Sequence, residues 1–334
     1  MVSSRPVLQT RQASLEQYLN DMKLFKRLIF LQEKKEALVT LTITSLIWGV
    51  SAPIMKLALL MAPVYLVAFL RFYGASFLIF LLKPNLYIAK KDIPRLFLAA
   101  FVGVTLHSPL FFYGLKLTSV MNAAILSAGT PVITLIFATV FLKEKVKKNL
   151  VYGCLFGMIG MLVVFLAPLV TEGVSVSIFG NLLLFTATFT WLLYEIICKD
   201  LTKRYAPSTI TFYTFFIGSL TLFPFALPSL LNEFPILLQN IHFVFYITFG
   251  ILFTSAIAFY CWMWGLSKLE VSRVGFFVYL DPVIATAAAF FMLKETITIP
   301  FLLGAAFIFF GLYIAETTIH WPHFHLTGHK GKQN

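Results

Sequence analysis

Four ionisable side chains lie inside long apolar stretches of this sequence, where a charge is costly to bury. They are Arg71, His107, Glu195 and Asp281. An ionisable group near the centre of a bilayer costs at least about 2.5 to 3.5 kcal/mol on insertion scales, so each is a candidate for solute binding or proton transfer. Structural roles stay open for all four: hydrogen bonding between helices, an ion pair, or a carboxylate that reaches the interface.

Three of these groups carry more specific chemistry. Glu195 lies four residues after Trp191, so a carboxylate and a flat aromatic surface share one helical face. That pair suits a cationic or aromatic solute. His107 titrates near neutral pH and also hydrogen-bonds polar solutes. Asp281 is the candidate for coupling transport to a proton gradient, and an ion pair with a buried cation is the alternative.

Polar aromatic side chains inside apolar runs extend the predicted binding site, because lipid offers their polar atoms no partner. The predicted substrate-binding residues are Trp48, Arg71, Tyr73, His107, Tyr113, Asn122, Trp191, Glu195, Tyr260 and Tyr279. Helix breakers at mid-membrane belong beside a cavity or in the protein interior. Pro131 and Pro282 are therefore the predicted hinge, with a passive kink as the alternative.

Motifs for other chemistry are missing from the sequence. It contains no H-E-x-x-H, no G-x-S-x-G and no P-loop, so neither a membrane-embedded enzyme nor direct use of ATP is indicated. The three cysteines, Cys154, Cys198 and Cys261, show no metal-ligand spacing. The histidines near the end of the chain are interpreted as part of a solvated tail instead of a metal site. No cofactor and no metal are expected.

The elements that carry these residues must be membrane helices. Hydrophobic residues make up 59% of the 334 residues and charged residues only 12%, against about 25% charged in soluble proteins. A helix needs roughly 20 apolar residues to cross the hydrocarbon. The fold class expected is an all-α membrane protein with ten such helices, over residues 37–60, 62–82, 96–116, 119–142, 150–170, 179–198, 209–230, 241–265, 271–293 and 299–319.

Basic residues set the expected orientation. With a cytoplasmic amino terminus, 22 of the 26 Lys and Arg residues fall in inside segments. The outside loops keep only Lys116 and Lys294, and this asymmetry places both termini in the cytoplasm. Residues 1–36 are expected to form a basic amphipathic arm on the headgroups. The lack of N-x-[ST] sites and of an obvious targeting signal favours a bacterial inner membrane.

An internal repeat divides the apolar region into two units. Because each unit holds five spans, the two copies must lie in opposite orientations across the membrane. The expected domains are 37–170 and 171–319, followed by a tail at 320–334. A shift of 151 residues superposes Gly114 on Gly265, Pro131 on Pro282, Glu144 on Glu295, Gly153 on Gly304 and Gly160 on Gly311, and shifts of 143 or 144 superpose Trp48 on Trp191, Lys56 on Lys199 and Gly74 on Gly218.

The same ordered series of motifs carries a family resemblance. The motifs are Trp48-Gly49 with Pro53, Arg71-Phe72, Tyr113-Gly114-Leu115, Thr130-Pro131-Val132, Leu142-Lys143-Glu144, Trp264-Gly265-Leu266, Asp281-Pro282-Val283 and Leu293-Lys294-Glu295. In these motifs the chain resembles the ten-helix EamA-type members of the drug/metabolite transporter superfamily, over about residues 37–319. The resemblance implies two inverted five-helix halves around a central cavity that opens alternately to each side. The chain departs from the family at Lys143 and Lys294, where glycine usually precedes the glutamate, and helix-end packing is expected to differ there.

Together these features predict a secondary transporter that moves a small metabolite by alternating access, with an amino-acid-like solute exported or exchanged. The solute class rests on the family resemblance alone. A nucleoside, an S-adenosylmethionine-like solute and a non-saturable channel remain the alternatives. The expected partners are a small-molecule substrate and the lipid bilayer, not nucleic acid, with the protein acting as a monomer or homodimer.

Overall fold

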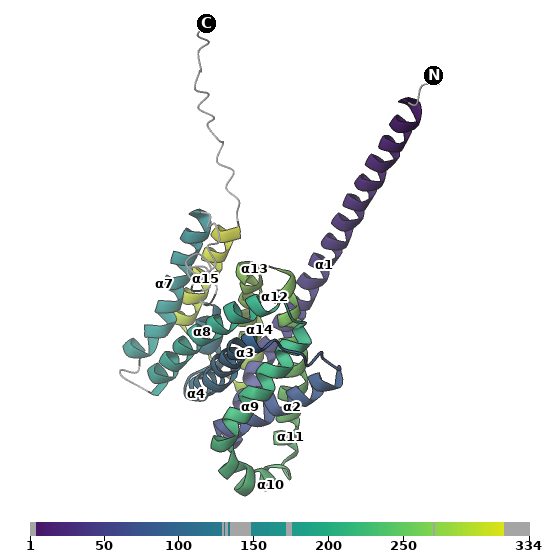
Figure 1. Cartoon of the computed structure of the whole chain (residues 1–334). Coiled ribbons are helices and arrows are strands. Elements are labelled where there is room, and N and C mark those ends of the chain that lie inside the picture. The colour runs from purple at the N-terminus through teal and green to yellow at the C-terminus, as the bar shows by residue number, and fades with distance from the viewer. Residues whose placement is uncertain are drawn as a thin grey trace.

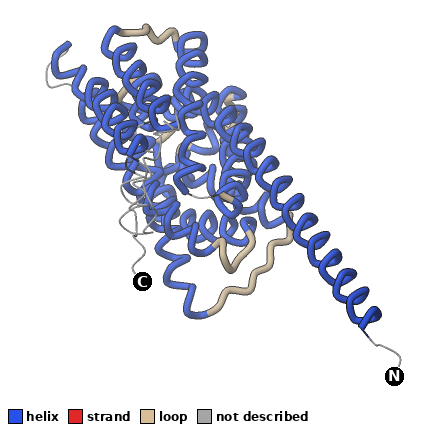
Figure 2. The backbone as a smooth tube through the Cα atoms, turned by 90° about the horizontal axis from the view of Figure 1, so that it is seen from above, coloured by secondary structure: helices blue, strands red, loops and turns tan. Residues whose placement is uncertain are grey.

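Every regular element that the structure describes is helical. The computed structural model describes residues 5–128, 130, 133, 148–171, 176–269 and 271–316, and Figure 2 shows helices joined by short loops. Pro131, Lys143, Glu144 and the tail from residue 320 lie outside the described residues. The α-helices are α1 (Arg5–Met61), α2 (Val64–Leu81), α3 (Ile93–Ala100), α4 (His107–Leu117), α5 (Val120–Ala128), α7 (Lys148–Thr171), α8 (Val176–Leu201), α9 (Pro207–Asn232), α10 (Phe234–Leu237), α11 (Ile241–Phe249), α12 (Ala258–Lys268), α13 (Val271–Gly275), α14 (Leu280–Leu293) and α15 (Ile299–Glu316).

Within the described residues, four short segments depart from α-helical geometry. Two are 3₁₀ turns, η1 (Lys90–Asp92) and η4 (Phe276–Tyr279). The other two are π-helical, η2 (Phe101–Leu106) inside the α3–α4 helix and η3 (Gly250–Ile257) inside the α11–α12 helix. The 151-residue shift of the sequence repeat superposes η2 on the last six residues of η3. The two π segments therefore occupy equivalent positions in the two copies.

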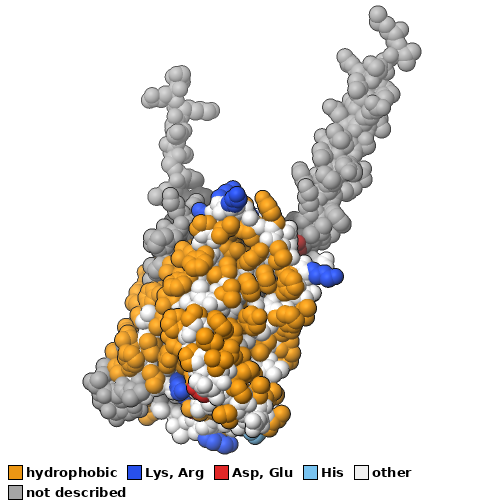
Figure 3. Space-filling view, turned by 60° about the horizontal axis from the view of Figure 1, so that its bottom comes forward, with side chains coloured by type: hydrophobic (Ala, Val, Ile, Leu, Met, Phe, Trp, Pro, Cys, Tyr) orange, Lys and Arg blue, Asp and Glu red, His pale blue; other side chains and the backbone are white. Residues whose placement is uncertain are grey.

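Within the described residues, six helices are long and apolar enough to cross a membrane. They are Lys35–Met61, Val64–Leu81, Lys90–Leu117, Ser177–Leu201, Pro207–Asn232 and Ile241–Lys268, and shorter apolar helices cover Val151–Val164, Leu280–Leu293 and Ile299–Gly311. Hydrophobic side chains cover the middle of the face seen in Figure 3, while Lys and Arg gather toward its ends. An apolar band with charged ends is the surface that a bilayer requires. The all-α membrane fold is thus confirmed, and the count of ten spans stays a prediction.

The amino-terminal arm is continuous with the first membrane helix. The helix α1 runs unbroken from Arg5 and projects from the bundle (Figure 1). The placement of residues 1–36 on the headgroups stays a prediction. The sequence contains neither glycine nor proline between Pro6 and Gly49, so no residue in that stretch interrupts the helix. Glu33 accepts a 2.7 Å ion pair from Lys268, which ties this part of α1 to the end of α12.

Several helices pack against segments to which the sequence repeat relates them. The second helices of the two copies, α2 and α9, pack against each other, and so do the last helices, α7 and α15. The first helix of one copy, α1, packs against α12 and α14 of the other, and α8 packs against α4 and α5 in the same exchanged manner. Between α7 and α15 the backbones touch, because a Cβ on Gly160 would lie 2.5 Å from the carbonyl oxygen of Gly304.

A carboxylate ties three helices together at one end of the bundle. Glu295 follows α14, and its Oε1 and Oε2 accept the backbone N–H groups of Val120 (2.8 Å) and Met121 (3.1 Å) in the first turn of α5. The ammonium group of Lys56 in α1 lies 3.3 Å from Glu295 Oε1 and 2.6 Å from the carbonyl oxygen of Thr118. A negative group at a helix N-terminus satisfies orphan N–H donors and the helix dipole.

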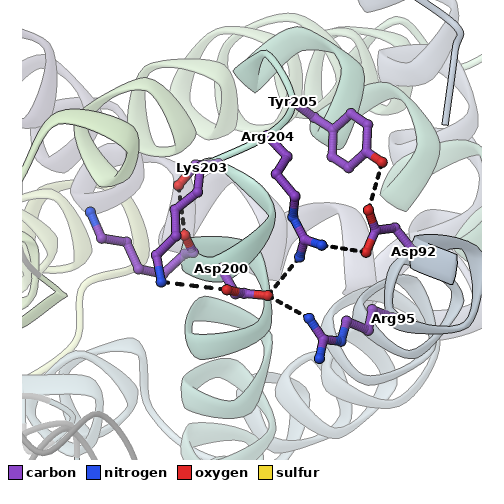
Figure 4. Close-up of polar contacts among 8 residues, drawn as sticks. Asp92, Arg95, Asp200, Lys203, Arg204 and Tyr205 are labelled. Atoms are coloured by element: carbon purple, nitrogen blue, oxygen red, sulfur yellow. Dashed lines mark hydrogen bonds and ion pairs between the residues drawn. The ribbon is translucent and has the colours of Figure 1, made fainter. Parts of the chain in front are cut away.

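A second cluster of charged residues joins the two copies where the start of α3 meets the loop that follows α8 (Figure 4). Asp92, which is only 2% exposed, accepts a 2.6 Å ion pair from Arg204 and a 2.7 Å hydrogen bond from the hydroxyl of Tyr205. That hydrogen bond raises the pKa of Tyr205. Asp200, at the end of α8, pairs with Arg204 and with Arg95 of α3, each at 2.7 Å. The start of α3 is thereby fastened to the loop that follows α8.

The backbone conformation of Lys294 explains why the EamA-type motif usually has glycine at this position, before the glutamate that is Glu295 here. Its φ is 56°, which places it in the left-handed region that costs an L-residue about 1 to 2 kcal/mol. We therefore expect Lys294→Gly to raise the melting temperature of the purified protein, by the equivalent of about 1 kcal/mol.

The matched control for this prediction is Lys116→Gly. Lys116 lies in the last turn of α4, where glycine is about 1 kcal/mol worse than other residues. Lys116→Gly should lower the melting temperature. If Lys294→Gly lowered it as well, the left-handed conformation of Lys294 would be refuted.

Candidate functional site

The middle of the bundle holds a cavity of about 160 Å³ between α1, α2, α4, α5, α8, η3, α12, η4 and α14. This volume lies below the roughly 300 to 1,000 Å³ of pockets for drug-sized ligands, so it suits a small solute. Its lining is mainly aromatic and aliphatic, with one guanidinium, one carboxyl and one imidazole group. The polar and charged residues that line it are Ser51, Arg71, His107, Ser108, Ser127, Thr130, Thr188, Thr254 and Asp281.

Two tryptophans related by the repeat meet at the centre of this cavity. Trp48 of α1 and Trp191 of α8 contact edge to face, with ring centroids 5.6 Å apart. Phe259 of α12 packs on both rings, at 5.2 Å from Trp48 and 5.5 Å from Trp191. We call these three side chains the aromatic wall. Because its tryptophans come from both copies of the repeat, the wall joins the halves at the cavity.

The indole of Trp48 is fixed in place by the π segment η3. Trp48 Nε1 donates to the carbonyl oxygen of Thr254 at 3.1 Å, and the Thr254 hydroxyl lies 2.7 Å from the hydroxyl of Ser51. A π segment shifts the backbone hydrogen bonds from i+4 to i+5, so side chains from other helices are well placed to bond its carbonyl groups. One face of the cavity is thereby held rigid.

Arg71 brings a buried positive charge to the cavity. The residue is 6% exposed, and its Nε donates to the hydroxyl of Ser255 at 2.6 Å. Its guanidinium lies over the rings of Phe72 and Phe112, 4.9 and 5.2 Å from their centroids. Among the residues that the structure describes, no Asp or Glu lies within ion-pair distance of it. Hydroxyl and aromatic partners offset only part of the cost of burying a cation.

Asp281 brings an unpartnered buried oxygen to the same cavity. Its Oδ1 has no hydrogen-bond partner within the described part of the chain, and the hydroxyl of Ser108, which also lines the cavity, has none there either. Buried polar atoms are almost always hydrogen-bonded in native proteins. Two such atoms in one cavity therefore indicate a place where a polar group of a ligand could form hydrogen bonds.

His107 presents one defined face to the cavity. Its Nδ1 lies 3.0 Å from the carbonyl oxygen of Ala187, and a carbonyl only accepts hydrogen bonds, so Nδ1 carries the proton. In the neutral imidazole Nε2 is then the acceptor. The ring packs 5.4 Å from Trp191 and stacks on Phe111. His107 thus extends the aromatic wall and adds a hydrogen-bond acceptor to it.

Glu195 lies behind the aromatic wall and does not line the cavity. It is 1% exposed, and its Oε1 accepts a 3.1 Å hydrogen bond from Nε1 of Trp262. Trp262 in turn packs 5.0 Å from Trp48. The four-residue spacing from Trp191 does put the two side chains on one part of α8, but Glu195 reaches the cavity only through neighbouring indoles.

The remaining predicted residues fall into three groups. Tyr73 (47% exposed) and Tyr113 (39% exposed) lie on the outer surface, where they pack on Phe69 and Tyr65. Asn122 and Tyr260 are partly buried but do not line the cavity. The Tyr279 side chain and Pro131 lie outside the described residues.

Pro282 occupies a different position in its helix from the one expected. It was predicted to interrupt a helix at midspan, but α14 begins at Leu280, so Pro282 lies in the first turn. Proline is tolerated there because the first N–H groups of a helix lack intrahelical partners anyway. The departure from α-geometry comes just before it, in η4, and such 3₁₀ segments often mark hinges. The hinge at Pro282 stays a prediction.

Sequence reasoning missed several small polar residues of the cavity. Ser51, Ser108, Thr254 and the neighbouring Ser255 are inconspicuous in apolar helices, where hydroxyls often bond their own backbone. One signal was available: the 151-residue shift superposes Thr254 and Ser255 on Gly103 and Val104, so the hydroxyl groups occur in one copy only.

Comparison with known proteins identifies the family of this chain. The model of the EamA-like transporter family matches residues 35–166 and 178–317. The chain belongs to the EamA-like transporter family. It is accordingly a multi-pass membrane protein of the drug/metabolite transporter group.

Relatives of this EamA-like protein are transporters. It is 27% identical to the uncharacterized transporter YetK of Bacillus subtilis, over 86% of this chain and 88% of that protein. It is 24% identical to a probable amino-acid metabolite efflux pump of Salmonella typhimurium, over 84% and 94% of the two chains. A solved crystal structure at 16% identity superposes with a TM-score of 0.60, covering 84% of this chain and 96% of the other, which shows a shared fold.

Two aromatic substitutions test whether the cavity is the binding site. We expect Trp191→Ala to lower transport by at least about tenfold, because large buried aromatic anchors carry much of a binding energy. Tyr73→Ala removes a ring of similar size from the outer surface of α2 and should leave transport within about twofold of the wild type. The measurement is the initial rate at which liposomes with equal amounts of folded protein take up a labelled solute. Equal losses in both variants would contradict the placement of the site.

Proposed function

We propose that this protein is a secondary carrier for a small amino-acid-like zwitterion, which it exports or exchanges by alternating access. One observation supports the proposal most: Arg71 and Asp281 line the same cavity, and in the described part of the chain Arg71 lacks an acidic partner and Asp281 Oδ1 lacks any partner. A solute with a carboxylate and an ammonium group supplies both missing partners.

The energetics favour a zwitterion over a singly charged solute. A guanidinium matches a carboxylate with two parallel hydrogen bonds, and a carboxylate accepts hydrogen bonds from an ammonium group. Bringing both poles into the cavity leaves its net charge unchanged, whereas a simple anion or cation would leave one buried group unpaired. The aromatic wall and His107 then face the side chain of the solute.

The relatives and the small cavity agree with this solute class. The Salmonella relative is named a probable amino-acid metabolite efflux pump, and that activity comes to this chain only as a proposal. The cavity volume of about 160 Å³ favours one amino-acid-sized solute over a nucleoside or an S-adenosylmethionine-like molecule.

The proposed carrier has ten membrane helices in two inverted five-helix halves. The ordered sequence repeat supports this arrangement, as do the exchanged packing of α1 and α8 and the equivalent positions of η2 and η3. We place both termini in the cytoplasm of a bacterial cell, in accordance with the basic segments. The carrier acts as a monomer or a homodimer.

Asp281 is the proposed coupling group. A proton and the ammonium group of the solute compete for the same carboxylate, so loading a proton favours release of the solute. This competition links an inward proton flux to outward solute movement. Neutralising Asp281 removes the response to a proton gradient while the helices around it stay in place.

Counterflow tests the carrier itself. Liposomes that contain the purified protein and unlabelled solute are diluted into labelled solute, using a panel of amino acids, nucleosides and S-adenosylmethionine. The proposal predicts saturable accumulation of amino acids that unlabelled amino acids inhibit. Flux that never saturates would identify a channel, and accumulation of nucleosides alone would exclude a zwitterion of amino-acid size.

Two neutral variants test the roles of the charged groups. Arg71→Gln should raise the KM for an amino acid by at least about tenfold, because hydrogen bonds to charged groups contribute about 1.5 to 3 kcal/mol. Asp281→Asn should abolish the acceleration of uptake or efflux by a pH gradient. If Asp281→Asn kept the full response to the gradient, the coupling role would be wrong.

A further inference from the structure

We propose that Ser255 is a positioning residue: it holds the guanidinium of Arg71 in the orientation that receives the carboxylate of the solute. The inference rests on the proposed function and deepens it, because it assigns part of the specificity to the π segment η3. Ser255 does not line the cavity itself. It acts through Arg71, to which its hydroxyl is bonded at 2.6 Å.

The contact uses one particular nitrogen of Arg71. Ser255 accepts from Nε, the nitrogen within the side-chain stem, so the bond leaves the two terminal nitrogens of the guanidinium free to point elsewhere. The rings of Phe72 and Phe112 flank the same group at 4.9 and 5.2 Å. A planar guanidinium that is held at Nε and lies over aromatic rings is restricted in the direction in which its terminal nitrogens can form bidentate bonds.

The backbone of η3 is shaped to accept this arginine. Gly250, the first residue of the π segment, lies against the stem of Arg71: a Cβ there would approach Cγ of Arg71 to 3.3 Å and the thioether of Met55 to 3.0 Å. Ser255 itself is fully buried. The neighbouring Thr254 bonds Trp48 and Ser51. One π segment therefore orients both the cation and the aromatic wall of the cavity.

The other copy of the repeat shows that packing alone does not require this pair. A shift of 144 residues relates Arg71 to Phe215, and a shift of 151 relates Ser255 to Val104. Both partners in the other copy are apolar and buried. At these two positions the other copy is apolar, although η2 and α9 also meet through the hydroxyls of Thr105 and Thr221. The pair of a cation and a hydroxyl therefore occurs in the copy that brings its positive charge to the cavity. This asymmetry favours a role in solute recognition over a role in stability.

Competition assays separate positioning from a general structural effect. Counterflow of a labelled amino acid is inhibited by the unlabelled amino acid, or by the amine that lacks only its carboxylate, such as phenethylamine for phenylalanine or isoamylamine for leucine. For Ser255→Ala we expect the inhibitory concentration of the amino acid to rise by at least about fivefold. The inhibitory concentration of the amine should change less than about twofold, because the amine makes no bond to Arg71.

Three variants control for folding and for the route of the effect. Ser219→Ala removes another fully buried hydroxyl, one that bonds the carbonyl oxygen of Phe216 on its own helix, and should change neither value. Ser255→Thr keeps the hydroxyl and should restore the affinity for the amino acid. In an Arg71→Gln background, Ser255→Ala should have no further effect, since it acts through the missing guanidinium.

The outcomes distinguish this inference from the proposed function. If the wild type shows no saturable amino-acid counterflow, the proposed function fails first. If the wild type transports but Ser255→Ala weakens amino acid and amine equally, or changes neither, the positioning role is overturned while the carrier stands. If Ser255→Ala does not fold, Ser255→Cys, which keeps the size of the side chain and replaces the hydroxyl with a weak acceptor, decides the question on the same readout.

Discussion

The burial of Arg71, with no Asp or Glu of the described residues at ion-pair distance, is the constraint on which the central cavity depends. A cation surrounded by hydrocarbon is tolerated only where other groups meet part of its cost. Here a serine hydroxyl and two phenyl rings meet that part. In the proposed function the carboxylate of the solute offsets the remainder, so the buried cation would be the source of selective binding.

Two kinds of polar contact surround the cavity. Hydrogen bonds hold its recognition groups, and ion pairs farther away join the two copies. Hydrogen bonds from Trp48 and Arg71 to η3 fix the recognition groups. Away from the cavity, two charged clusters fasten the halves to each other: Glu295 with Lys56 and the start of α5, and Asp92 and Asp200 with Arg204. In the proposed carrier these ion pairs are contacts between the two copies that lie outside the cavity.

The sequence predicted the helical membrane fold and the family because both depend on apolar length and ordered motifs, which do not require side-chain orientation. Which residues line the cavity depends on side-chain orientation. Tyr73 follows Arg71 by two residues, which is a rotation of about 200° around a helix, so the two side chains cannot both face the cavity. Helical phase alone would have placed Tyr73 on the lipid side.

The positions of Ser255 and Pro282 depend on departures from regular α-helix. Hydrophobic periodicity assumes 3.6 residues per turn, and η3 breaks that register just where Thr254 and Ser255 meet Trp48 and Arg71. In the same way, η4 ends one helix and lets α14 restart two residues before Pro282. A single sequence carries no direct signal for a π segment, so these contacts became visible only in three dimensions.

The most direct test of the account is a structure of the protein with an amino acid bound. The carboxylate of the amino acid is predicted to lie within hydrogen-bond distance of the terminal nitrogens of Arg71, with its ammonium group on Asp281 Oδ1 and its side chain against Trp48 and Trp191. An amino acid bound outside this cavity would contradict the account. So would a bound state in which Arg71 and Asp281 pair with each other and the solute contacts neither.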